Sequence, residues 1–269
     1  MAGRMLWAGG VAAIFLAVAA RAQTDCEAGN GLLDFAQPKT MSVAEVIQKF
    51  AAAEAATKAA RVGYTFTQDA LVQTLAGKAV DGEFHEVASI SYDEKGRRQE
   101  NVTFAEQTTL KRIQLTAEDM DDIRVFMPFT LTTGDLPEYN LSYAGQQHVD
   151  ELDTYVFHVE PKKEEKNKRY FQGRIWVDGQ DFQIVKVCGK TVPQRIRVKK
   201  GEHQDLQPSF VTYRQLVDGR YWFAGYARSD DTLQFRNASI RVREVIKYSN
   251  YKRTGASAET KTAGDGTKP

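Results

Sequence analysis

Residues 170–190 read YFQGRIWVDGQDFQIVKVCGK and predict a β-hairpin. The dipeptide Asp178-Gly179 stands between two apolar stretches, Phe171–Val177 and Phe182–Cys188. Asp-Gly readily adopts the positive φ angles that tight hairpin turns require. We therefore expect two antiparallel strands that are joined at this dipeptide.

Both faces of this hairpin are apolar. Because side chains alternate along a strand, one face would carry Ile175, Val177, Phe182 and Ile184, and the other Trp176, Val185 and Val187. Two interpretations are open. The sheet has material packed on each side, or it is curved and holds an apolar cavity.

The same patterns continue along the chain. Asp218-Gly219 lies between Phe210–Val217 and Arg220–Tyr226, and a two-residue turn there would pair Leu216 with Tyr221. Apolar and polar residues also alternate around residues 62–67, 88–92, 155–159 and 240–248, where Glu244 is the one polar member of an apolar face. Successive hairpins predict an antiparallel, meandering sheet.

Two helices are expected outside the strands. Ser42-Val43-Ala44-Glu45 is a capping box, and the apolar residues Val43, Val46, Ile47 and Phe50 follow at helical spacing in a segment that runs to Ala60. A short acidic helix is expected over Thr116–Phe126. Met127-Pro128 would end it, because the residue before proline avoids the helical region.

The start of the chain predicts an export signal. Arg4 precedes the uncharged apolar run Met5–Ala20, and Ala20-Arg21-Ala22 has the small-x-small pattern of a cleavage site. A membrane anchor is the alternative, but a span needs about 20 apolar residues. The expected organisation is a signal peptide (1–22), an extended N-terminal segment (23–41), one domain (42–253) and a disordered tail (254–269). The mature protein would be soluble in an exported, oxidising compartment.

The chain has two cysteines, Cys26 and Cys188. Disulfides persist in exported proteins, and a bridge would pin the N-terminal segment to a strand. The alternative is one mobile and one buried thiol. We favour the bridge.

No motif predicts catalysis or a bound metal. The 269 residues include 36 Lys and Arg against 35 Asp and Glu, so no strong positive charge suggests nucleic-acid binding. The four histidines form no pair with metal-ligand spacing, and no nucleophile elbow is present. Asp150 and Asp153 could serve a hydrolase, but a solvated turn is the favoured interpretation. We expect a monomer that is not an enzyme and needs no cofactor.

The hairpin stretch also carries a resemblance to a known family. It resembles the exported bacterial outer-membrane lipoprotein-sorting proteins of the LolA/LolB/RseB-like superfamily. The resemblance is to the large branch of that superfamily. Four other stretches share that resemblance, namely Met127–Thr132, Asp218–Phe223, Asp230–Leu233 and Val245–Lys252. The resemblance covers most of Ser42 to Arg253.

The resemblance implies an α+β, mainly β fold, in which an antiparallel sheet curves into a half-barrel with helices on its concave side. It implies a periplasmic carrier that holds the acyl chains of a lipid or lipoprotein in a hydrophobic cavity. The same fold also serves non-catalytic envelope sensors, so a protein-interaction module with a packed core is the alternative.

The candidate site residues follow from this picture. The predicted cavity lining is Tyr64, Phe66, Ile90, Tyr155, Phe157, Ile175, Val177, Phe182, Ile184, Leu216, Tyr221 and Phe223. Val46 and Phe50 are the predicted helix plug. Arg195, Arg197 and Lys199 alternate with apolar residues. They form either a charged edge strand or a docking strip for an anionic partner or lipid headgroups, and the edge strand is favoured.

Overall fold

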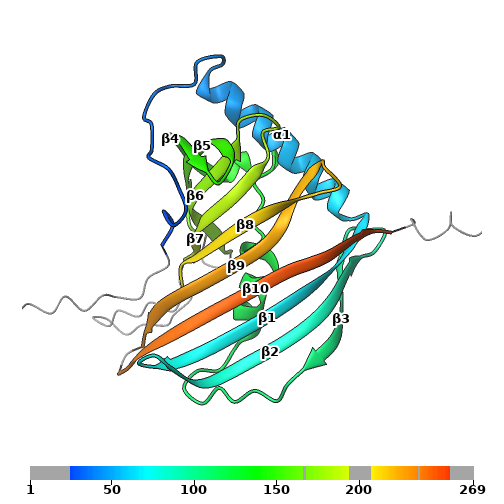
Figure 1. Ribbon diagram of the computed structural model, residues 1–269, viewed down its shortest axis with the longest axis vertical. Coiled ribbons are helices and arrows are strands. Elements are labelled where there is room, and N and C mark those ends of the chain that lie inside the picture. Colours follow the sequence, from blue (N-terminus) through cyan, green and yellow to red (C-terminus); the bar gives the residue numbers. More distant parts are fainter. Residues whose placement is uncertain (1–24, 166–167, 194–206, 236, 255–269) are drawn as a thin grey trace, which may run out of the picture.

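The computed structural model describes residues 25–165, 168–193, 207–235 and 237–254. Its centre is one sheet of ten antiparallel strands in the order β3-β2-β1-β10-β9-β8-β7-β6-β5-β4 (Figure 1). The strands are β1 (Tyr64–Ala76), β2 (Ala79–Tyr92), β3 (Arg98–Ala105), β4 (Tyr139–Val149), β5 (Leu152–Pro161), β6 (Tyr170–Asp178), β7 (Ile184–Val192), β8 (Phe210–Val217), β9 (Tyr221–Gln234) and β10 (Ser239–Arg253).

The sheet curves but does not close, because β3 and β4 are its two free edges. The helix α1 (Val43–Arg61) crosses one end of the strands, and the segment between β3 and β4 carries α2 (Ala117–Asp121), η1 (Asp122–Phe126) and η2 (Leu136–Glu138) (Figure 1). Residues of α1 and η1 share one core with the inner side of the sheet. The predicted mainly β, antiparallel half-barrel with helices on its concave side is confirmed.

Helix α1 begins as its sequence predicts. The Ser42 hydroxyl accepts a hydrogen bond from the Glu45 amide, and the Glu45 carboxylate accepts one from the Ser42 amide, so the capping box is complete. Val46 and Phe50 are fully buried, and the Phe50 ring centroid lies 5.5 Å from that of Phe157 on β5. The predicted plug residues therefore fix α1 on the concave face.

The acidic segment is helical over the predicted range, but in two forms. Thr116 and Asp119 form a second capping box at the start of α2. The following five residues of η1 are a π-helix, which ends at Phe126; its C-cap Met127 stands directly before Pro128. This segment supplies Ile123 and Met127 to the core.

The β6–β7 hairpin buries apolar side chains on both faces. Ile175, Val177 and Ile184 join the concave core, whereas Trp176 and Val185 pack on the convex side. Val177 pairs with Ile184 and Trp176 with Lys186, so Val185 is an extra residue in β7. This bulge turns Val187 to the concave core, where strict alternation would place it on the convex face.

The N-terminal segment covers the convex face. Cys26 and Cys188 are joined by a disulfide with a Cα–Cα distance of 5.7 Å. Asn30 and Asp34 form isolated bridges to Val149 and Gln146 on β4. The segment thus runs as a strap over the outer side of the β6–β7 hairpin.

One predicted lining residue is misplaced. Val217 pairs with Tyr221 and Leu216 with Trp222, so the second hairpin turn contains Asp218, Gly219 and Arg220 rather than two residues. Leu216 is 48% exposed and does not face a cavity. The prediction for Leu216 is wrong, because a turn with one more residue shifts every pair of the hairpin.

Several predictions lie outside the described residues. They are the signal peptide 1–22, the docking strip of Arg195, Arg197 and Lys199, and all of the tail 254–269 except Thr254. Among the described residues, no helix is both long enough and apolar enough to cross a membrane.

Candidate functional site

The predicted cavity residues are mostly packed against one another. Phe66, Ile90, Phe157, Ile175, Val177 and Ile184 are buried in the concave core together with Val46 and Phe50. Tyr64, Tyr221 and Phe223 form a smaller aromatic cluster, in which the Tyr64 and Phe223 ring centroids are 5.1 Å apart. Tyr155 and Phe182 are half-buried and stack on each other at 6.4 Å.

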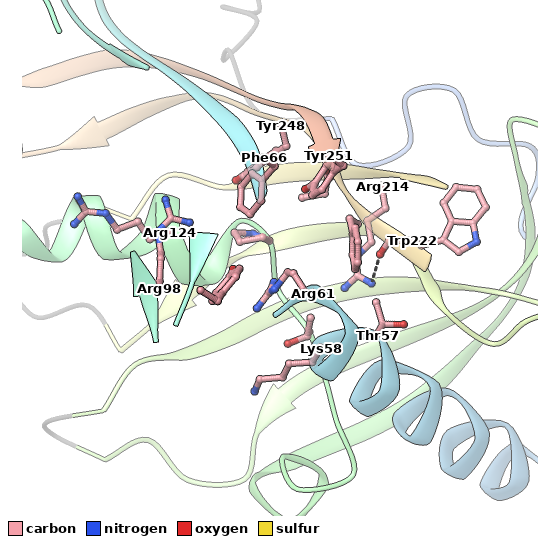
Figure 2. A pocket seen from close by; sticks show the side chains of 15 residues that line it. Thr57, Lys58, Arg61, Phe66, Arg98, Arg124, Arg214, Trp222, Tyr248 and Tyr251 are labelled. Carbon is pink, nitrogen blue, oxygen red and sulfur yellow. Dashed lines mark hydrogen bonds between the residues drawn. The ribbon is translucent and has the colours of Figure 1, made fainter. Parts of the chain in front are cut away.

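The space beside the C-terminal end of α1 is small. Figure 2 shows Phe66, Tyr248 and Tyr251 above the end of the helix, with Arg61 at the centre of the pocket. The cavity there measures about 20 Å³, which is room for about one water molecule. The concave face beneath α1 is therefore filled by its own side chains.

The arginines around this small pocket are largely neutralised by neighbours. Arg214 donates to both carboxylate oxygens of Glu54 on α1, at 2.8 and 3.0 Å. Arg98 and Arg124 share Glu100, and Arg61 lies over the Tyr92 ring at 5.5 Å. This pocket combines structural ion pairs with an aromatic floor.

A larger cavity lies farther along the same face, between the α2–η1 segment and strands β7–β10. We call it the α2 cavity. Its volume is about 310 Å³, at the lower end of the range of about 300–1,000 Å³ for small-molecule sites. Its apolar lining consists of Ile113, Leu115, Ile123, Met127, Pro208, Phe210, Leu233, Phe235 and Val242.

The α2 cavity has a buried floor and an open rim. Ile123, Met127, Phe210 and Val242 on the floor are buried. Gln114, Thr116 and Glu118 on the rim are exposed, so the cavity opens to solvent there. None of the twelve predicted lining residues contributes to it. The cavity therefore lies in a different part of the concave face from the predicted one.

Glu244 on β10 is the unusual member of this lining. It is 9% exposed, and no described hydrogen bond or ion pair reaches its carboxyl group. The two arginines that could have paired with it are engaged elsewhere: Arg214 with Glu54, and Arg243 with Asp230. Burial raises the pKa of Glu244 to about 8, and the nearby carboxylates of Asp122 and Asp119 raise it as well.

Asp122 lies across the cavity from β10, on η1. Arg169, which is mostly buried, donates a hydrogen bond to one oxygen of Asp122, and the hydroxyl of Thr191 lies 3.3 Å from that same oxygen. Burial raises the pKa of Asp122 to about 7, and the Arg169 guanidinium opposes that rise. The other oxygen, Oδ1, is buried and has no hydrogen-bond partner in the part of the chain that the structure describes.

The raised pKa of Glu244 predicts a pH-dependent stability. Between about pH 4.5 and 8 the folded protein holds a proton at Glu244 that the unfolded chain releases, so stability falls as pH rises. We expect Glu244→Gln to match the wild type near pH 5 and to be more stable at pH 9. The difference should grow by up to about 1.4 kcal/mol per pH unit within this window.

Urea unfolding at a series of pH values measures this difference. Asp122, Asp119 and Arg169 face the same region and remain in both proteins, so subtraction removes their titration. Glu151→Gln, at an exposed turn, is the control: its free energy of unfolding should change with pH in parallel with that of the wild type. If the free energy of unfolding of Glu244→Gln also changes with pH in parallel with that of the wild type, the prediction of a buried, protonated Glu244 is contradicted.

The other candidate chemistry finds little support in the geometry. Asp150 lies on the exposed turn before β5 and Asp153 is an exposed residue near the start of β5, where it is 3.1 Å from the ring of His148. In the part of the chain that the structure describes, no three His, Cys, Asp or Glu residues gather as a metal site would require. Sequence reasoning singled out Glu244 as a polar residue on an apolar face but did not foresee the cavity beside it.

Solved structures with a similar course of the chain include a DUF1329 family protein from Desulfovibrio piger, with 13% identity, a TM-score of 0.36 and coverage of 78% of this chain and 94% of that one. A putative outer membrane lipoprotein-sorting protein domain from Vibrio parahaemolyticus has 12% identity, a TM-score of 0.36 and coverage of 80% and 95%. A LolA superfamily protein from Nitrosomonas europaea has 13% identity, a TM-score of 0.31 and coverage of 75% and 93%. No protein-family model and no curated protein matches the chain.

Proposed function

We propose that this protein is a non-catalytic binding protein for acyl chains, of the kind that handles lipids or lipoproteins in the cell envelope. The α2 cavity is the observation that carries the proposal. It is open at its rim, apolar on its floor and about 310 Å³ in volume. Each methylene group that leaves water for such a floor contributes about 0.8 kcal/mol, so one short chain gives useful affinity without any catalytic group.

The proposed setting is an exported, periplasmic compartment. The disulfide between Cys26 and Cys188 supports this, since structural disulfides persist mainly in oxidising compartments. The apolar run Met5–Ala20, with its small-x-small end, supports it independently.

A substitution that fills the cavity tests the proposal. Val242 is buried at the floor, and a phenylalanine there would extend into the space that the chain occupies. We expect Val242→Phe to weaken binding of the neutral fluorophore N-phenylnaphthylamine about tenfold, which equals a loss of about 1.4 kcal/mol. Fluorescence titration of the purified protein measures the affinity, and competition with octanol shows that the probe occupies an alkyl site.

Val102→Phe is the matched control. Val102 is also a strand valine, but it lies on β3, is 48% exposed and does not line the cavity. It should bind the probe as the wild type does. Equal affinity of Val242→Phe and the wild type, with both proteins folded, would place the probe elsewhere and remove the support from the cavity.

The packed face beneath α1 favours a second candidate, a protein-interaction module without a lipid. The cavity there of about 20 Å³ cannot hold a chain, and the core around Phe50 and Phe157 is closed. Lipid mass spectrometry of protein purified from its own compartment without detergent separates the two. A stoichiometric lipid supports the carrier, whereas a clean, folded protein that captures one envelope protein supports the module.

A further inference from the structure

The α2 cavity is acidic as well as apolar. Its described lining includes four carboxyl-bearing residues, Glu118, Asp119, Asp122 and Glu244, and no lysine, arginine or histidine. Arg169 lies behind this wall and balances Asp122. Asp119 accepts the hydrogen bonds of its capping box. Glu244 is left as the lining carboxyl group that no described hydrogen bond or ion pair reaches, and a positively charged ligand beside it would favour its ionised form.

Polar groups without a partner among the described residues lie in the inner part of this cavity and beside it. The Glu244 side chain is nine-tenths buried and has no hydrogen-bond or ion-pair partner among the described residues. Ser229, its paired residue on β9, has a buried hydroxyl without a partner, and Oδ1 of Asp122 is in the same state. Paired residues of neighbouring strands share a face of the sheet. Buried polar groups are normally satisfied, so these groups, next to an open cavity, are ones that a polar ligand head would satisfy.

An alkylammonium group would suit both the acidic lining and the buried polar groups that lack a described partner. It carries positive charge and several N–H donors, whereas these carboxylates can only accept hydrogen bonds when ionised. A hydrogen bond to a charged group contributes more than one between neutral groups. A carboxylate or phosphate head would instead find no basic residue in the described lining.

We propose that the α2 cavity selects amphiphiles with a cationic, amine-bearing head, which Glu244 binds while the alkyl chain lies on the apolar floor. This inference rests on the proposed function, because it assumes that an alkyl chain enters the cavity. It adds the chemical class of the head group and assigns Glu244 as the residue that recognises it.

Three ligands of equal chain length test the selection. Octylamine, octanol and octanoate differ only in the charge and donors of the head, and all can be titrated calorimetrically into the disulfide-bonded protein at pH 7. We expect octylamine to bind at least about tenfold more tightly than octanoate, with octanol between them. Glu244→Gln should reduce the preference for octylamine over octanol at least about threefold. Glu151→Gln, an exposed control outside the cavity, should keep it.

The outcomes separate the two proposals. If all three ligands bind but octanoate binds as tightly as octylamine, the charge selection is overturned and the acyl-chain site stands. If none binds, the proposed function fails, and the selection fails with it. If Glu244→Gln prefers octylamine over octanol as strongly as the wild type does, another group recognises the head and the role of Glu244 is overturned.

A second measurement covers the case in which Glu244→Gln does not fold. An ammonium bound beside a protonated carboxyl group displaces its proton, so octylamine binding to the wild type should release protons, whereas octanol binding should not. Titration in two buffers with different heats of ionisation counts those protons. Asp122, Asp119 and Arg169 are the other charged groups that face this point, and they are present with both ligands. Equal proton release by octanol and octylamine would overturn the proposal.

Discussion

Replacing Glu54 by glutamine or alanine is expected to lower the free energy of unfolding by about 3–5 kcal/mol, because it leaves a buried guanidinium without its counter-charge. Glu54 is fully buried on α1, and the side chain of Arg214 is 2% exposed. Their contact is bidentate, at 2.8 and 3.0 Å.

The pair also connects several parts of the fold. Oε1 of Glu54 accepts the amide of Ile184 at the start of β7, and Arg214 donates to the carbonyl groups of Trp222 and Phe129. The loss of Glu54 therefore frees α1, a hairpin and the segment after η1 at the same point. Urea unfolding monitored by circular dichroism measures the change.

Glu138→Gln is the control for this experiment. Glu138 pairs with Lys168 at the surface, where the two side chains are 42% and 46% exposed, so its loss should cost less than about 1 kcal/mol. The double variant Glu54→Leu with Arg214→Leu should recover much of the stability lost by Glu54→Gln, since neither charge then stays buried alone. A cost for Glu54→Gln no larger than that of Glu138→Gln would refute the argument.

Removal of the disulfide, by Cys26→Ala with Cys188→Ala, should cost about 2–5 kcal/mol. The bridge joins residues 162 apart in sequence, and long loops gain the most from cross-linking in the unfolded state. The loss should also release the strap. Its residues cover Lys186, whose Nζ lies 2.6 Å from Oδ1 of Asn30 and 3.2 Å from the Ala28 carbonyl oxygen.

The acetylation of Lys186 provides a local measurement of whether the strap is released. It is fully buried between the rings of Trp176 and Tyr213, and burial lowers its pKa to about 8. In the oxidised protein it should resist acetylation, and reduction should open it to the reagent, as mass spectrometry of peptides detects. Exposed Lys252 is the internal control and should react equally in both states. Unchanged protection of Lys186 after reduction would show that the strap holds without the bridge.

Much of the architecture follows from patterns that span few residues. The Ser42 capping box and the apolar spacing of Val46 and Phe50 define α1 before any contact is known. Asp178-Gly179 marks the first hairpin for the same reason, because turn geometry is a local property of the backbone. The second turn shows the limit: one additional residue in it moved Leu216 from a predicted lining position to solvent.

The site depended on longer distances. The amino-acid sequence by itself determined the order of helix and strands and the apolar excess on both faces of the sheet, and it predicts an export signal. Only the tertiary structure decided that Arg214 meets Glu54, 160 residues away, and so leaves Glu244, beside the α2 cavity, without a partner among the described residues. Side chains compete for partners and volume across the whole curved sheet, so the place where the core stays open depends on contacts that no local pattern encodes.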